Sequence, residues 1–106
     1  MIKRKGLPFS SAVERDQRRQ GRWAACLHSG SRQPVDVISI EFVEESKYLD
    51  GLTVFFISCV GARLSARKRV ALLELADEFG AQALLARPDN GGVTYEYLQF
   101  EKEVDL

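Results

Sequence analysis

Residues 52–60 read Leu-Thr-Val-Phe-Phe-Ile-Ser-Cys-Val and make up the most apolar stretch of the chain. A continuous apolar run of this length is typical of a strand that is buried on both of its faces. Such a strand lies inside a sheet that has a packing layer on each side. We therefore expect residues 52–60 to form the central strand of a covered sheet.

The segment after this strand predicts the longest helix, over residues 66–79. Ser65 is a residue type favoured at helix N-caps, and Gly80 is the type favoured just beyond a helix C-terminus. Between them, apolar residues recur with the period of a helix: Val70, Leu72, Leu73, Leu75, Ala76 and Phe79. The first turn holds Arg67-Lys68-Arg69, where the helix dipole disfavours cations, and charge that costs stability is sometimes retained for binding.

Weaker signals place the remaining elements. We expect a helix over 12–20, after Ser10-Ser11 and before Gly21, and strands over 23–27, 35–43, 82–87 and 93–100. Residues 88–92, with a proline, an asparagine and two glycines, predict a tight turn. The order helix, three strands, helix, two strands predicts one α/β domain over residues 1–106, with a mixed β-sheet flanked by helices.

Composition excludes several classes of protein. The 106 residues, 45% hydrophobic and 28% charged, suit a single domain with a modest core. No apolar run is long enough to span a membrane, and the basic N-terminus leads into no apolar segment, so we expect neither a membrane span nor a secretory signal. Cys26 and Cys59 lie in apolar runs and are expected to be reduced and buried. These features predict a cytoplasmic protein.

A net charge of zero conceals an asymmetry. Residues 1–32 carry eight Lys/Arg and two Asp/Glu, a net charge of +6, whereas residues 33–106 carry seven and thirteen, a net charge of −6. The basic part is either a solvated arm or a surface that meets a polyanion such as nucleic acid. Stacking on a base is one role for Trp23, but we expect this residue to pack in the core.

Residues suited to catalysis are scarce. His28 is the one histidine, lies in a predicted loop and has no acidic neighbour in the sequence, and Cys26-x-His28 lacks the second ligand pair of a zinc site. The sequence contains no glycine-rich phosphate loop and no nucleophile elbow. We therefore expect no catalytic residue, no metal ligand and no cofactor site in this chain.

From residue 12 to residue 100 the order and spacing of several segments resemble the archaeal tRNA-splicing endonucleases. The similar segments are Val13, Arg15, Asp16, Arg18 and Gly21 in the first helix, Gly30 with Val35-Asp36-Val37, Leu84-Leu85-Ala86, and Val93-Thr94-Tyr95-Glu96-Tyr97-Leu98. Glu14, Gln17, Gln20 and Arg22 depart from the pattern. The resemblance implies a restriction-endonuclease-like fold, similar to the C-terminal domain of these tRNA-intron endonucleases.

The catalytic tyrosine, histidine and lysine of that family do not carry over. Ile40 stands near the place of the tyrosine, residues 51–53 contain no histidine, and Gly80-Ala81 stands at the place of the lysine. The resemblance therefore implies a structural, non-catalytic subunit. Its partners are then a catalytic endonuclease subunit, in a complex of two catalytic and two structural subunits, and pre-tRNA cut at a bulge-helix-bulge.

The resemblance also implies contact residues. Pairing of final strands between unlike subunits assigns Val93, Tyr95, Tyr97 and Phe100 to the subunit interface. Asp89 either docks into a basic cleft of another subunit or is a turn residue chosen for its Asx geometry. The residues predicted to touch RNA are Arg15, Arg18, Arg19, Arg22 and Arg32.

Two other interpretations stay open. Gly30-Ser31 and Pro34-Val35-Asp36 are similar to the segment that supplies the first metal carboxylate of Holliday-junction resolvases. The next strand would then place an E-x-K motif at Ser58 and Val60, which offer neither a carboxylate nor an amine, so the chain is a degenerate resolvase-like protein that binds nucleic acid. The third interpretation is a small nucleic-acid-binding or protein-interaction module.

Overall fold

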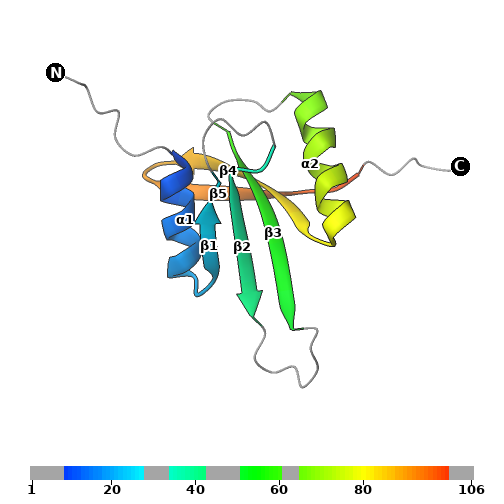
Figure 1. The fold of residues 1–106 in the computed structure, drawn as a ribbon. Coiled ribbons are helices and arrows are strands. Elements are labelled where there is room, and N and C mark those ends of the chain that lie inside the picture. The colour runs from blue at the N-terminus through cyan, green and yellow to red at the C-terminus, as the bar shows by residue number, and fades with distance from the viewer. Residues whose placement is uncertain (1–8, 28–33, 43–50, 61–64, 101–106) are drawn as a thin grey trace, which may run out of the picture.

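The computed structural model describes residues 9–27, 34–42, 51–60 and 65–100. They form one five-stranded sheet with a helix on each face (Figure 1). The elements are α1 (Phe9–Arg19), β1 (Trp23–Cys26), β2 (Val37–Phe42), β3 (Leu52–Cys59), α2 (Ala66–Phe79), β4 (Gln82–Asp89) and β5 (Gly92–Leu98). The α/β class and the order of elements agree with the prediction from sequence.

The strands lie in the sheet in chain order, β1-β2-β3-β4-β5. β1, β2 and β3 pair antiparallel, β3 and β4 pair parallel, and β4 and β5 pair antiparallel. The parallel pair requires a crossover connection, which α2 provides. The sheet is therefore mixed, and β3 is its central strand.

Alternate side chains of β3 face the two helices. Phe55 and Ile57 belong to the apolar cluster beneath α1, which also includes Val13, Ala24, Val37, Leu84 and Ala86. Phe56 and Val60 belong to the cluster beneath α2, which includes Leu72, Leu73, Ala76, Ala83, Leu85 and Leu98. The expectation of a central strand covered on both faces is thus confirmed.

α2 has the bounds that its capping residues predict. The Ser65 Oγ accepts a hydrogen bond from the backbone N–H of Lys68, and Gly80 ends the helix in a left-handed conformation with φ 68°. α1 begins at Phe9, three residues before the predicted start, because Phe9 packs against the cluster beneath this helix. Ser10 and Ser11 consequently lie within its first turn.

The β4–β5 hairpin is longer than predicted. Pro88 and Asp89 continue β4 and pair with Val93 and Gly92, around a turn at Asn90-Gly91 in which both residues have positive φ. β3 pairs with β4 only as far as Ala86, so Pro88 lies in a two-stranded ribbon where a missing N–H breaks no second ladder. The prediction that the segment 88–92 is wholly a loop was therefore wrong.

Trp23 does not lie in the core, in contrast to the expectation from sequence. Its side chain is 51% exposed, whereas its neighbour Ala24 is fully buried beneath α1. Because side chains alternate along a strand, burying Ala24 turns Trp23 to the opposite face of the sheet. α2 covers that face over β3 and β4, and Trp23, Phe42 and Leu52 remain exposed beyond it.

Candidate functional site

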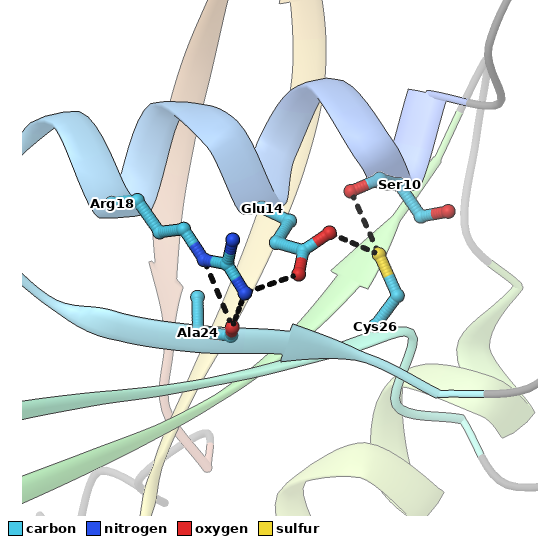
Figure 2. A network of polar contacts seen from close by, with 5 residues as sticks. All are labelled: Ser10, Glu14, Arg18, Ala24 and Cys26. Carbon is cyan, nitrogen blue, oxygen red and sulfur yellow. Dashed lines mark hydrogen bonds and ion pairs between the residues drawn. The ribbon is translucent and has the colours of Figure 1, made fainter.

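Two carboxylates, Glu14 and Asp36, lie at the edge of the sheet where β1 ends and β2 begins. Glu14 is on α1, and its side chain points toward β1 between Arg18 and Cys26 (Figure 2). The Sγ of Cys26 lies 3.3 Å from Glu14 Oε1 and 3.3 Å from the carbonyl oxygen of Ser10. The single proton of this thiol thus faces two acceptors. The pKa of the Cys26 thiol is raised, chiefly by burial and to a smaller extent by the neighbouring Glu14.

Arg18 neutralises the other oxygen of Glu14. Its Nη2 lies 3.0 Å from Glu14 Oε2, one helical turn away. The same guanidinium donates to the carbonyl oxygen of Ala24 from Nε and Nη2, at 3.3 and 3.0 Å. Arg18 therefore fixes α1 on β1 and is the counter-ion of Glu14, and its side chain still remains 60% exposed.

Asp36 is held by the backbone of the neighbouring strand. Its Oδ2 accepts a hydrogen bond of 2.7 Å from the backbone N–H of Cys59, and its own N–H donates to the carbonyl oxygen of Ile57. Burial, with smaller contributions from the charges of Asp36 and Cys26, raises the pKa of the Cys59 thiol to about 12. Both cysteines are free, and both are uncharged thiols at neutral pH.

Near Asp36, the residues of β3 that face α1 are Ile57 and Cys59, and Phe55 precedes them on the same face. Both contact the cluster beneath α1, whereas Val60 lies in the cluster beneath α2. We expected Ser58 and Val60 at the places of an E-x-K motif. This expectation was wrong by one residue, because side chains alternate along a strand and Val60 faces α2, away from Glu14. An apolar side chain and a thiol occupy these places instead.

Within the described ranges, no three His, Cys, Asp or Glu side chains lie close enough together to hold a metal ion. The oxygens of Glu14 and Asp36 contact Arg18, Cys26 and the Cys59 N–H. A divalent cation prefers several free carboxylate and carbonyl oxygens. Among the described residues, Glu14 is thus engaged by Arg18 and Cys26, and Asp36 by the backbone N–H of Cys59.

The outer side of α1 is basic. Arg15, Arg18 and Arg19 are exposed, and a pocket of about 220 Å³ is lined by Ser11, Glu14, Arg15 and Arg18. Arg19 lies 3.7 Å from Asp16 and its side chain is 70% exposed, so this pair is weak. These three of the predicted RNA-binding residues are brought together on one exposed surface. Arg32 and His28 lie outside the described residues.

Arg22 has a different environment. Its side chain is only 17% exposed, donates to Gln17 Oε1 at 2.8 Å and lies 4.4 Å above the ring of Phe55. The Ser39 Oγ donates to the same Gln17 oxygen at 2.8 Å. This buried polar network was missed from the sequence, because a glutamine on a helix and a serine in a strand carry no signal of burial. It binds α1 to β2 and positions the basic surface.

The residues predicted for a subunit interface divide into two groups. Val93 and Tyr95 pack against the cluster beneath α1, and Tyr95 donates a hydrogen bond to Asp16. Tyr97 and Phe100 are exposed, next to a pocket of about 390 Å³ between α2 and the end of β5. Asp89 accepts a hydrogen bond of 2.8 Å from the Thr94 hydroxyl across the hairpin, which agrees with a role in the turn.

The geometry of this chain is similar to that of a known nuclease. The Holliday junction resolvase Hjc from the archaeal hyperthermophile Archaeoglobus fulgidus superposes with a TM-score of 0.63 and 19% sequence identity, over 84% of this chain and 74% of the resolvase. The chain has the restriction-endonuclease-like fold. No family model matches the sequence, and no curated protein matches it. In the described parts of the chain, no helix is long and apolar enough to cross a membrane.

Proposed function

We propose that this chain binds the duplex arms of branched DNA through α1 and does not cleave them. The observation that carries the proposal is the pairing of Glu14 with Arg18 and Cys26, on a helix whose outer side is basic. The similarity in fold to a resolvase supports DNA as the class of ligand.

The exposed arginines supply the affinity. Arg15, Arg18 and Arg19 lie three and four residues apart on one exposed side of α1, where they can meet phosphates of one strand. Each neutralised phosphate of a duplex releases counter-ions and lowers the slope of log K against log salt by about 0.9. Three such contacts therefore give a slope of log K against log salt of about −2.7. The Tyr95–Asp16 bond and the Gln17 network hold this helix in place.

Hydrolysis of a phosphodiester by a metal-dependent nuclease needs carboxylates that bind cations and a group that activates water. Glu14 and Asp36 are each engaged by donors of the chain itself, and Ile57 and Cys59 supply neither charge nor a base at neutral pH. These contacts support binding without cleavage.

The test is a fluorescence anisotropy titration of a labelled four-way DNA junction, a duplex and a single strand. We expect the junction and the duplex to bind, and we expect Arg15→Gln with Arg19→Gln to reduce the magnitude of the salt slope by about 2. Arg87→Gln is the matched control, because Arg87 pairs with Glu96 away from α1. Incubation of the junction with magnesium should leave it uncut.

A second candidate is the structural subunit of a tRNA-splicing endonuclease. The observation that favours it is the exposed end of β5, where Tyr97 and Phe100 border the pocket next to α2. An edge strand with exposed aromatic residues is suited to pairing with another subunit. Co-expression with a catalytic subunit should then give a complex of two plus two chains that cuts pre-tRNA, and Tyr97→Lys should dissociate it. Separate elution of the two chains would exclude this candidate.

A further inference from the structure

The first turn of α2 carries three cations at the end of the helix where they destabilise it. Arg67, Lys68 and Arg69 occupy this turn, which contains no acidic residue, and the last turn contains no basic residue. The acids of α2, Glu74, Asp77 and Glu78, all lie in its C-terminal half. This distribution is the reverse of the one that the helix dipole favours.

This turn projects past the sheet. Leu72, Leu73 and Ala76 face the core, and Arg69 lies three and four residues before the first two of them, on the same side of the helix. Arg69 is nevertheless exposed, as is every residue from Ser65 to Ala71. In Figure 1, α2 begins beyond the ends of the strands. The side chains of the first turn are therefore open to solvent.

The three cations also have few local partners. The side chains three and four residues further along the helix are Val70, Ala71, Leu72 and Leu73, which carry no charge. None of the ion pairs formed among residues 9–27, 34–42, 51–60 and 65–100 includes Arg67, Lys68 or Arg69. The patch is therefore a concentrated positive charge that is open to a polyanion.

We propose that Arg67, Lys68 and Arg69 form a second phosphate-binding surface, which contacts DNA in addition to the arginines of α1. The inference rests on the proposed function and extends it to the opposite face of the sheet. The side chains make the contacts, and the N–H groups of Lys68 and Arg69 are already bonded to Ser65.

The test replaces the three cations by glutamine: Arg67→Gln, Lys68→Gln and Arg69→Gln in one variant. Binding of a fluorescein-labelled DNA duplex is measured by anisotropy between about 50 and 300 mM salt. We expect the magnitude of the slope of log K against log salt to fall by up to about 2.7, the value for three lost phosphate contacts. A fall of at least about 0.9, one contact, supports the proposal, and a smaller change overturns it.

A matched control separates the loss of phosphate contacts from the effect of a changed net charge of α2. Glu74→Gln, Asp77→Asn and Glu78→Gln change the net charge of α2 by the same amount in the opposite direction, at the other end of the helix, and should leave the slope unchanged. The thermal midpoint of the three-cation variant should equal or exceed that of the wild type, because an unfavourable interaction with the dipole is removed. If the wild-type chain binds no DNA, the proposed function fails. If it binds and the variant keeps its slope, only the second surface is refuted.

Discussion

The hydroxyl of Tyr95 donates a 2.7 Å hydrogen bond to Oδ2 of Asp16 and thereby joins the last strand to the first helix, 79 residues earlier in the chain. Burial raises the pKa of the Tyr95 hydroxyl, so the hydroxyl stays a donor at all moderate pH. Asp16 lies between the basic residues Arg15 and Arg19. The bond therefore sets how the proposed DNA-binding helix sits on the sheet.

Replacing Tyr95 by phenylalanine removes this bond and keeps the ring. A hydrogen bond to a carboxylate contributes about 1.5–3 kcal/mol when buried, and we expect a loss of about 1–2 kcal/mol for this half-buried one. Urea unfolding at neutral pH measures the loss. Tyr97→Phe is the control, since Tyr97 is exposed, and it should change the free energy of unfolding by less than about 0.5 kcal/mol. Equal effects of the two substitutions would contradict the structural role of Tyr95.

The Gln17 network predicts an order of destabilisation. Ser39→Ala removes one of two donors to Gln17 Oε1 and should cost about 1 kcal/mol. Gln17→Leu removes the acceptor of the Ser39 hydroxyl and of Arg22 Nη1, while Arg22 Nη2 keeps Glu41, and should cost about 2–3 kcal/mol. Chemical denaturation of the two variants checks the order. A smaller loss for Gln17→Leu than for Ser39→Ala would show that the network is not formed.

Cys59 predicts a loss of stability in alkali. Its pKa is raised from 9.0 to about 12, so above pH 9 the unfolded chain releases a proton that the folded chain keeps. The free energy that the protonated Cys59 thiol contributes to stability is fully present below pH 9, and it is lost as the pH rises toward about 12. The free energy of unfolding should fall by at most about 1.4 kcal/mol per pH unit for this one proton.

Unfolding curves of the wild type and of Cys59→Ala between about pH 8 and pH 10.5 test this prediction. The variant should have a shallower decline with pH, whatever its stability at neutral pH. Parallel declines would mean that the Cys59 thiol titrates alike in both states.

Trp23 is the one tryptophan of the chain, so tryptophan fluorescence reports on this position alone. Because Trp23 is 51% exposed, acrylamide should quench its emission in the folded protein, although less efficiently than in the unfolded one. A folded protein that resists quenching would place Trp23 in a core or an interface.

The sequence predicts the fold best where the physical signal is local. The uninterrupted apolar run of β3 and the Ser65 and Gly80 caps of α2 depend on neighbouring residues, and the structure places both elements as expected. Trp23 was misplaced because its burial depends on which part of the sheet α2 covers, and this is a tertiary property. The extension of β4 through Pro88 was missed for a related reason, since the ribbon beyond β3 tolerates a proline that a central strand does not.

The candidate site was only partly predictable. The exposed arginines of α1 follow from the charge pattern, and Arg15, Arg18 and Arg19 do lie together. The Glu14–Arg18 pair has the i,i+4 spacing of a helix, but the contact of Glu14 with Cys26 joins a helix and a strand, and the period of α1 alone does not reveal it. The choice between Val60 and Cys59 beside the carboxylates depended on a one-residue shift along β3, which flips a side chain to the other face of the sheet.

The salt dependence of four-way junction binding tests the central claim most directly. The claim predicts that the wild type binds the labelled junction at about 50 mM salt with a negative slope whose magnitude is at least about 2.7, and leaves the strands uncut when magnesium is present. Arg15→Gln with Arg19→Gln should flatten the slope by about 2. A slope near zero for the wild type, or cut strands on a denaturing gel, would contradict the claim.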